Sequence, residues 1–205
     1  MAERLIKQAA NNTERQETYK YQLGRYRKAL KEEFYFEAMI IVYSMLEDRL
    51  KAFLYYVGAF NNRNTLKVSN KTKTELKMLL YMECGEKSKF SLTNISGKIN
   101  LVKAIINWAE CSNEPLDSAY LSCLKLMVEG VDIGAIRECL ENLESWLGYR
   151  NEVMHAAMNK NLDALYNGLD EKVELGMAFA RELDSYVKLL KKDNSVRKML
   201  KMGNG

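Results

Sequence analysis

The chain has 205 residues, enough for one domain, and 47% of them are hydrophobic, which is ample for a buried core. Its start has no apolar run of signal-peptide length, and its longest apolar run, "AMIIVYSML", is too short to span a membrane, so we expect a cytoplasmic protein. None of the four cysteines has the CxxC spacing of a zinc site or redox pair, so we expect reduced, mostly buried thiols.

The first half of the chain predicts two long helices, because breakers are few and no stretch alternates clearly enough for strands. We expect one helix over about 13–32, with Thr13 as its cap. A second helix is expected over about 34–58. It is apolar on nearly every side, which is typical of a central buried helix, and Gly58 is a suitable stop.

The middle of the chain, about 61–130, reads as an insertion of loops and shorter helices. The segment "TELKMLLYMEC" predicts a helix capped by Thr74, and "ISGKINLVKAIINWAEC" predicts another after a cap at Thr93 or Asn94. The only proline ends that helix, and Asp117 can cap a further short helix through about 128.

The last third predicts two more long helices. Asp132 can cap one that runs to about 159, and a final helix follows over about 162–191. The whole chain is therefore expected to form one all-α domain over 1–205, with core helices at about 34–58 and 132–191, a basic N-terminal helix at 1–32 and a basic tail at 192–205.

The formal net charge of +4 hides an uneven distribution. Residues 1–31, 60–103 and 187–205 carry net charges of +5, +6 and +5, whereas residues 104–186 carry −9. Three basic segments around an acidic middle fit a polyanion-binding surface, although helical proteins also place such charges on solvated faces.

The stretch "YRNEVMH" contains the only histidine of the chain, His155, five positions after Arg150. On a helical wheel with Arg150 at zero, the leucines and methionines of this helix fall between about 20° and 80°, and Trp146 and Val153 fall at about −40° and −60°, so Arg150 lies within the apolar arc. Asn151 and His155 fall near the polar border, at about 100° and 140°.

An arginine on an apolar face needs an explanation, because guanidinium keeps its charge when buried. It could form an internal ion pair with Glu47 or Asp48, or extend past its neighbours to solvent. It could also line a cleft or subunit seam and bind a phosphate. A lone histidine at such a border is commonly a solvated or core residue.

The motif resembles the signature of the HEPN superfamily of all-α proteins: Arg, four to six residues, then His, often with a polar residue directly after the Arg. Here these are Arg150, Asn151 and His155, and the similarity extends over residues 34–58 and 132–190. Many members are ribonucleases of bacterial toxin, abortive-infection and CRISPR-effector systems. Others lack the motif and act as binding partners, so the resemblance alone does not make the chain an enzyme.

Metal-free RNA cleavage needs an acid, a base and a cation for the phosphate. His155 can transfer protons near neutral pH, Arg150 can bind the scissile phosphate, and Asn151, one turn before His155, can orient the imidazole. Glu47 or Asp48 could support Arg150 from the central helix.

One histidine per chain suggests a homodimer with a composite site, as the resemblance also implies. No HExxH, EF-hand, Walker, GxGxxG or GxSxG pattern occurs, so we expect no metal and no cofactor. The expected partners are RNA and an antitoxin or defence-system protein. The alternatives are a non-catalytic HEPN-like module that binds RNA, a nucleotide or a protein, and a helical scaffold in which the motif is coincidental.

Overall fold

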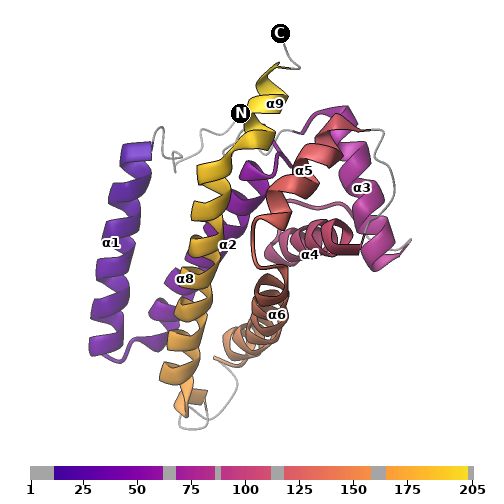
Figure 1. Cartoon of the computed structure of the whole chain (residues 1–205). Coiled ribbons are helices and arrows are strands. Elements are labelled where there is room, and N and C mark those ends of the chain that lie inside the picture. The colour runs from indigo at the N-terminus through magenta and orange to yellow at the C-terminus, as the bar shows by residue number, and fades with distance from the viewer. Residues whose placement is uncertain (1–11, 62–67, 86–88, 112–117, 158–164, 203–205) are drawn as a thin grey trace, which may run out of the picture.

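The computed structural model describes residues 12–61, 68–85, 89–111, 118–157 and 165–202, and the regular elements in these ranges are all helices (Figure 1). The expected all-α fold is confirmed. None of the described helices is both long and apolar enough to cross a membrane. The helices are α1 (Asn12–Lys31), α2 (Tyr35–Tyr56), α3 (Asn70–Cys84), α4 (Ile95–Cys111), α5 (Ala119–Glu129), α6 (Ile133–Ala156), α8 (Leu169–Asp193) and α9 (Ser195–Met202).

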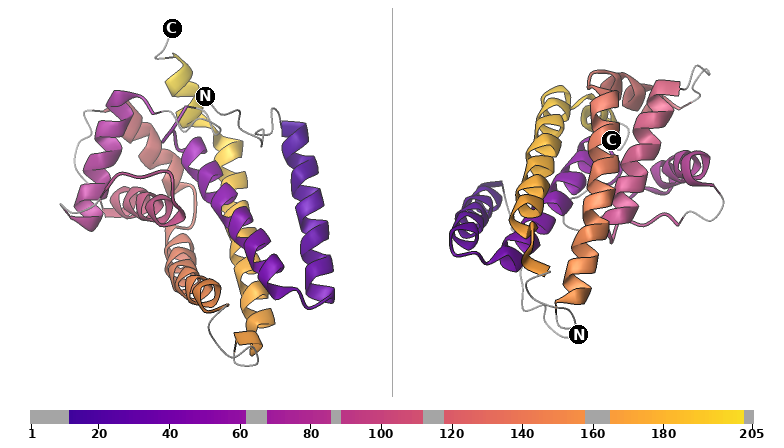
Figure 2. Two further views of the ribbon diagram at one scale, coloured as in Figure 1. Left: turned by 180° about the vertical axis from the view of Figure 1, so that it is seen from behind. Right: turned by 90° about the horizontal axis from the view of Figure 1, so that it is seen from below.

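Helix α2 runs beside α8 and also contacts α1 and α4 (Figures 1 and 2). Ten of its side chains are buried, among them Val42, Leu46 and Phe53, while Ile40 on another side is 51% exposed. The helix ends before Gly58, whose φ of +80° favours a residue without a side chain. A Cβ at that position would also lie 2.8 Å from Val196 of α9, so this glycine is required for packing as well.

Helices α2, α6 and α8 approach one another closely at Gly176 of α8. A Cβ there would lie 2.5 Å from Trp146 of α6 and 2.8 Å from Val42 of α2. The Trp146 indole N–H also donates a hydrogen bond to the Lys172 carbonyl of α8 (2.7 Å). Trp146 therefore fixes α6 against α8 one turn before Arg150.

The segment expected as an insertion contributes α3, α4 and α5. Helix α4 packs on α2 and α6, and its side chains Ile99, Val102 and Ile105 are fully buried in the common core. Much of this segment is therefore built into the bundle. The carboxamide of Asn94 accepts a hydrogen bond from the Gly97 N–H (2.7 Å), in agreement with one of the two caps expected for this helix.

Two other expected caps differ from the structure. Helix α3 begins four residues before Thr74 and is capped by Ser69, whose hydroxyl accepts from the Thr72 N–H. Ser118 caps α5, and Asp117 lies outside the described residues. The expected cap Asp132 is confirmed, since its carboxylate accepts from the Ala135 N–H (3.0 Å).

The basic tail is partly helical, because α9 follows α8 after a left-handed residue at Asn194 (φ +46°). Arg197 of α9 donates hydrogen bonds to the carbonyls of Phe60 and Asn61 (3.1 and 3.2 Å), just beyond α2. Its guanidinium also lies 4.1 Å from the centre of the Tyr55 ring. The sequence predicted no helix in this tail, and these contacts hold the short helix against the rest of the chain.

Candidate functional site

The motif lies in the last two turns of α6, at one edge of the bundle (Figure 2). Upstream of it, the apolar side chains Ile136, Leu140, Leu143 and Leu147 are buried, which holds this face of α6 against its neighbours. The helix ends at Ala156, and residues 158–164, which include the expected end near 159, lie outside the described residues.

Arg150 is half-buried, as its place within the apolar arc predicts. Its guanidinium carbon lies 4.5 Å from the centre of the Tyr43 ring of α2, which is a cation–π distance. Its Nη1 donates a hydrogen bond to the side-chain oxygen of Asn151 (3.1 Å), while the buried Nε has no hydrogen-bond partner. No carboxylate pairs with Arg150 among the described residues, so its charge is compensated only by a ring and an amide.

The other two motif residues are exposed. Asn151 is brought to Arg150 by the hydrogen bond between their side chains, and His155 faces solvent one turn further along the helix. This arrangement places a cation, a carboxamide and an imidazole on one accessible edge of α6. Such a set can bind a phosphate and transfer a proton beside it.

The two supporting acids have other partners. Glu47 accepts hydrogen bonds from Lys98 of α4 (3.0 Å) and pairs with Lys51 (3.1 Å), whereas Asp48 lies 3.5 Å from Arg49. Lys98 is fully buried and also donates to the Asn94 carbonyl (3.1 Å). Glu47 therefore pairs with the buried cation Lys98 and not with Arg150, the partner expected from the sequence.

Burial alone would raise the pKa of the Glu47 carboxyl, but hydrogen bonds from Lys98 and Lys51 outweigh it and the pKa is lowered. Burial lowers the pKa of the Lys98 amine, against the attraction of Glu47. Each group thus favours the charged form of the other, against the cost of burial.

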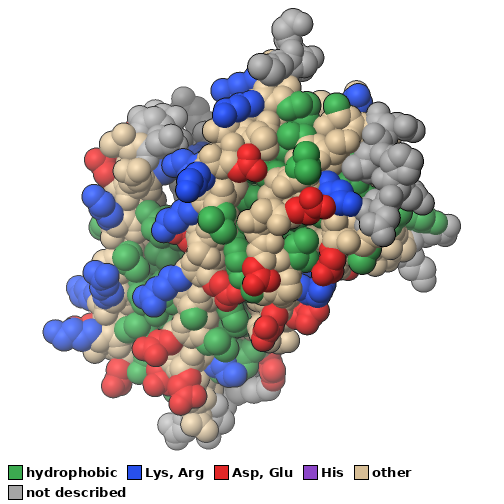
Figure 3. All heavy atoms as spheres, viewed as in Figure 1, with side chains coloured by type: hydrophobic (Ala, Val, Ile, Leu, Met, Phe, Trp, Pro, Cys, Tyr) green, Lys and Arg blue, Asp and Glu red, His purple; other side chains and the backbone are tan. Residues whose placement is uncertain are grey.

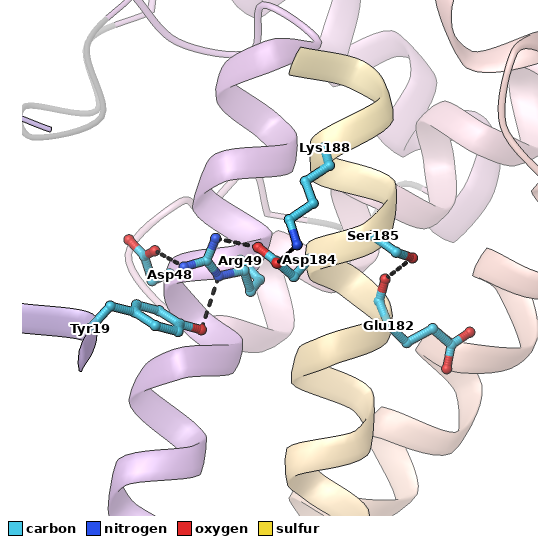
Figure 4. Close-up of polar contacts among 7 residues, drawn as sticks. All are labelled: Tyr19, Asp48, Arg49, Glu182, Asp184, Ser185 and Lys188. Carbon is cyan, nitrogen blue, oxygen red and sulfur yellow. Dashed lines mark hydrogen bonds and ion pairs between the residues drawn. The ribbon is translucent and has the colours of Figure 1, made fainter. Parts of the chain in front are cut away.

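A groove of about 1230 Å³ lies between α1, α2 and α8, on a different face of α2 from Tyr43. Its lining includes a polar network that joins the three helices (Figure 4). Arg49 of α2 donates to the Tyr19 phenol of α1 (3.1 Å) and to Asp184 of α8 (2.6 Å), which also pairs with Lys188 (2.8 Å). Asp48, which was expected from the sequence to support Arg150, joins this network through Arg49, and the sequence alone did not single out Tyr19, Arg49, Asp184 or Lys188.

The basic segments gather away from the motif. Lysines and arginines cover α1 and the C-terminal half of α8, whereas acids gather lower on α8 and over the neighbouring face toward α6 (Figure 3). The basic helix α3 stands at the opposite side of the bundle from α1 (Figure 1). Two of the three basic segments thus meet at the groove, and neither wall of that groove carries the motif.

Among the described residues, no group of three or more histidine, cysteine or acidic side chains is placed to hold a metal ion. The cysteines Cys84 and Cys111 are exposed, Cys123 is half-buried and Cys139 is buried. The expectation of mostly buried thiols is therefore wrong for the first two, each of which is the last residue of its helix.

Tyr43 and Lys98 are the site residues that the sequence reasoning missed. Lys98 lies within the apolar stripe of α4, between Ile95 and Val102, so the criterion that singled out Arg150 would also have found it. Tyr43 precedes Glu47 by one turn of α2, but only the packing of α2 against α6 brings its ring to Arg150.

No family model matches the chain, and neither the curated proteins nor the solved structures include a significantly similar one. The functional assignment therefore depends on the motif residues of α6 and on the groove.

Proposed function

We propose that this protein is a metal-independent endoribonuclease of the HEPN type that cleaves single-stranded RNA, in a toxin, abortive-infection or CRISPR-linked defence role. One observation carries the proposal: the half-buried guanidinium of Arg150 has no carboxylate partner among the described residues and lies beside an exposed carboxamide. A permanent charge left in this way is suited to an anionic ligand such as a phosphate.

In the proposed reaction, a base removes the proton of the RNA 2′-hydroxyl, and the resulting oxygen attacks the adjacent phosphorus. The bond from phosphorus to the 5′-oxygen breaks, and an acid gives that oxygen a proton. The products are a 2′,3′-cyclic phosphate and a 5′-hydroxyl. Arg150 stabilises the charge on the phosphate, His155 transfers one proton, and Asn151 orients the imidazole or donates to the phosphate.

The reaction needs two proton transfers, and each chain has a single histidine. A symmetric dimer in which the motif ends of two α6 helices face each other would place two imidazoles in one cleft. Asn151 and His155 are exposed in the single chain, as such a shared cleft requires. A strictly monomeric protein with full activity would contradict this composite site.

The direct test is to incubate the protein with mixed RNA in EDTA and to detect 2′,3′-cyclic phosphate ends. We expect His155→Ala to lower the cleavage rate by about 10²- to 10⁴-fold, the usual contribution of a general acid or base. Arg150→Ala should have an effect of similar size, because it removes the phosphate ligand.

A matched control is Asn142→Ala, an exposed asparagine on the same helix more than two turns before the motif. This variant should cleave RNA at the wild-type rate. Circular dichroism of each variant separates loss of chemistry from loss of folding. Equal cleavage by the wild-type and His155→Ala proteins would indicate a contaminating nuclease and would contradict the proposal.

A second function is favoured because the basic side chains of the groove lie apart from the motif helix α6, whose exposed face is acidic. The exposed face of α6 carries Glu138, Glu141, Glu144 and Glu152, which repel RNA, and the basic groove lies on a different face of α2. A non-catalytic helical module that binds RNA, a nucleotide or a protein fits this arrangement. It predicts binding without cleavage, and identical binding by the wild-type and His155→Ala proteins.

A further inference from the structure

We propose that the groove between α1, α2 and α8 is a docking site for an acidic amphipathic helix of a partner protein. This inference goes beyond the ribonuclease reaction and does not depend on it, because the groove lies on a different face of α2 from the ring that contacts Arg150.

The shape of the groove suits a helix. Its lining residues on α1 extend from Arg15 to Arg25, about 15 Å along the helix axis, which matches about ten residues of another helix. Its apolar lining consists of aliphatic side chains from all three helices, namely Leu23, Ile40, Ile41, Met45 and Val187. Three of these side chains are already buried in the chain, with exposed fractions of 4–5%, whereas Ile40 is 51% exposed and Leu23 is half-buried. Ile40 and Leu23 therefore provide the apolar surface that a partner can bury.

The charge of the groove defines the kind of helix that fits. Its lining includes seven basic and three acidic side chains, a net charge of +4. Two of the bases, Lys20 on α1 and Lys191 on α8, are exposed and stand on opposite walls. Hydrophobic side chains lie between two rows of basic ones in this part of the surface (Figure 3). Exposed apolar surface between basic side chains complements a helix with one apolar face and acidic flanks.

A nucleic acid strand fits the groove less well. Single-stranded RNA binds through basic side chains combined with exposed aromatic rings on which its bases stack. Of the two tyrosines that line the groove, Tyr19 is covered by the guanidinium of Arg49, whose carbon lies 4.2 Å from the ring centre. The other, Tyr56, is half-buried, and the most exposed apolar side chain of the groove, Ile40, is aliphatic and offers no ring on which a base could stack.

The test measures binding of a fluorescent peptide of about 18 residues, or five helical turns, with leucines on one helical face and glutamates elsewhere. A peptide of the same composition in permuted order, without an apolar face, is the peptide control. We expect the amphipathic peptide to bind the full chain and the permuted one to bind at least about tenfold more weakly, since only the first presents an apolar face to Ile40 and Leu23.

The double variant Lys20→Glu, Lys191→Glu should weaken peptide binding about tenfold, because it reverses one charge on each wall. Its control is Lys192→Glu, Lys198→Glu, which makes the same change in net charge outside the groove. Ile40→Ser should weaken binding to a similar extent, whereas Leu189→Ser should not. Leu189 is comparably exposed (49%) but does not line the groove.

Three results would overturn the proposal. The first is equal binding of both peptides, or no binding of either. The second concerns a uridine oligonucleotide of similar length. If it binds the wild-type chain, binds the Lys20→Glu, Lys191→Glu variant more weakly and binds the Ile40→Ser variant equally well, the groove is a nucleic-acid site. The third is dissociation of a dimer in the same double variant, which would place a second copy of the chain in the groove. RNA cleavage by these variants is measured separately and should equal that of the wild type.

Discussion

Two cations lie on apolar helix faces of this protein, and their surroundings differ. Lys98 of α4 is fully buried, with Glu47 at 3.0 Å and a backbone carbonyl at 3.1 Å. Arg150 of α6 is half-buried, with the Tyr43 ring, the Asn151 carboxamide and an Nε without a hydrogen-bond partner. On a helical wheel the two residues look alike.

The difference separates a structural cation from one that is available to a ligand. The charge of Lys98 is neutralised by Glu47, so a ligand would have to displace that carboxylate. Among the described residues, the Arg150 guanidinium interacts only with a ring and an amide oxygen, neither of which carries a negative charge. Its positive charge is therefore available to an incoming anion. The comparison therefore predicts that mutations at Lys98 and its partner change stability, whereas mutations at Arg150 change function.

The largest effect on stability is expected from Glu47→Ala. This change leaves Lys98 buried without its carboxylate, and we expect the free energy of unfolding to fall by about 3 kcal/mol. Urea denaturation followed by circular dichroism measures it. Glu37→Ala, which removes the exposed partner of Arg25, is the control and should cost less than about 1 kcal/mol. Equal losses in the two variants would remove the distinction between the pairs.

The ion pair between Glu47 and Lys98 predicts that the free energy of unfolding decreases at acidic pH. Because the pKa of Glu47 is lower in the folded state than in the unfolded one, its stabilising contribution is complete above the unfolded pKa and is lost as the pH falls through the folded pKa. Urea midpoints measured between about pH 6 and pH 3 should therefore decline in the wild type. The decline should be shallower in Glu47→Gln, and an identical slope in both would contradict the assignment.

A smaller effect on stability is expected from Arg150→Leu. The change removes a cation–π contact and a hydrogen bond with an exposed amide, but it also fills an apolar site with an apolar side chain. We expect the free energy of unfolding to change by no more than about 1 kcal/mol in either direction. RNA cleavage should nevertheless be lost, and a loss of several kcal/mol would instead make Arg150 a second structural cation.

The smallest effect is expected from Tyr43→Phe, which keeps the ring beneath Arg150 and removes only the hydroxyl. Its free energy of unfolding should remain within about 0.5 kcal/mol of the wild type, whereas Tyr43→Ala should lose both the ring contact and buried area. Comparing RNA cleavage by the two variants tests whether the ring positions the guanidinium. Equal activity in both would show that it does not.

The sequence predicted the helices of the fold well, because the signals involved are local. Asp132, Asn94 and Gly58 act at single helix ends, and the apolar periodicity of α6 and α8 is long enough to define both helices. The prediction missed the start of α3 because Ser69 and Thr74 are both good caps and the polar turn between them has no apolar signal. It missed α9 because that helix is stabilised by contacts with residues more than 130 positions away.

The candidate site was predicted only as far as one helix defines it. The half-burial of Arg150 and the exposure of His155 follow from their positions on α6, whereas the hydrogen bond between Arg150 and Asn151 was not predicted. The partner of Arg150 does not follow from these positions, because it depends on how α2 and α6 pack, and the expected carboxylate Glu47 points to α4 instead. The groove was not predicted either, since it exists only where α2 meets two helices, α1 and α8, that reach into separate basic segments.

The tight packing of Trp146 against Gly176 gives the protein an optical reporter of its own. The chain has two tryptophans, and both are buried, with exposed fractions of 2% for Trp146 and 9% for Trp108. A Trp108→Phe variant would leave a single indole one helical turn from Arg150, hydrogen-bonded to the Lys172 carbonyl. Its fluorescence would respond to events at the motif end of α6, such as pairing of two chains or binding of RNA, without an attached dye.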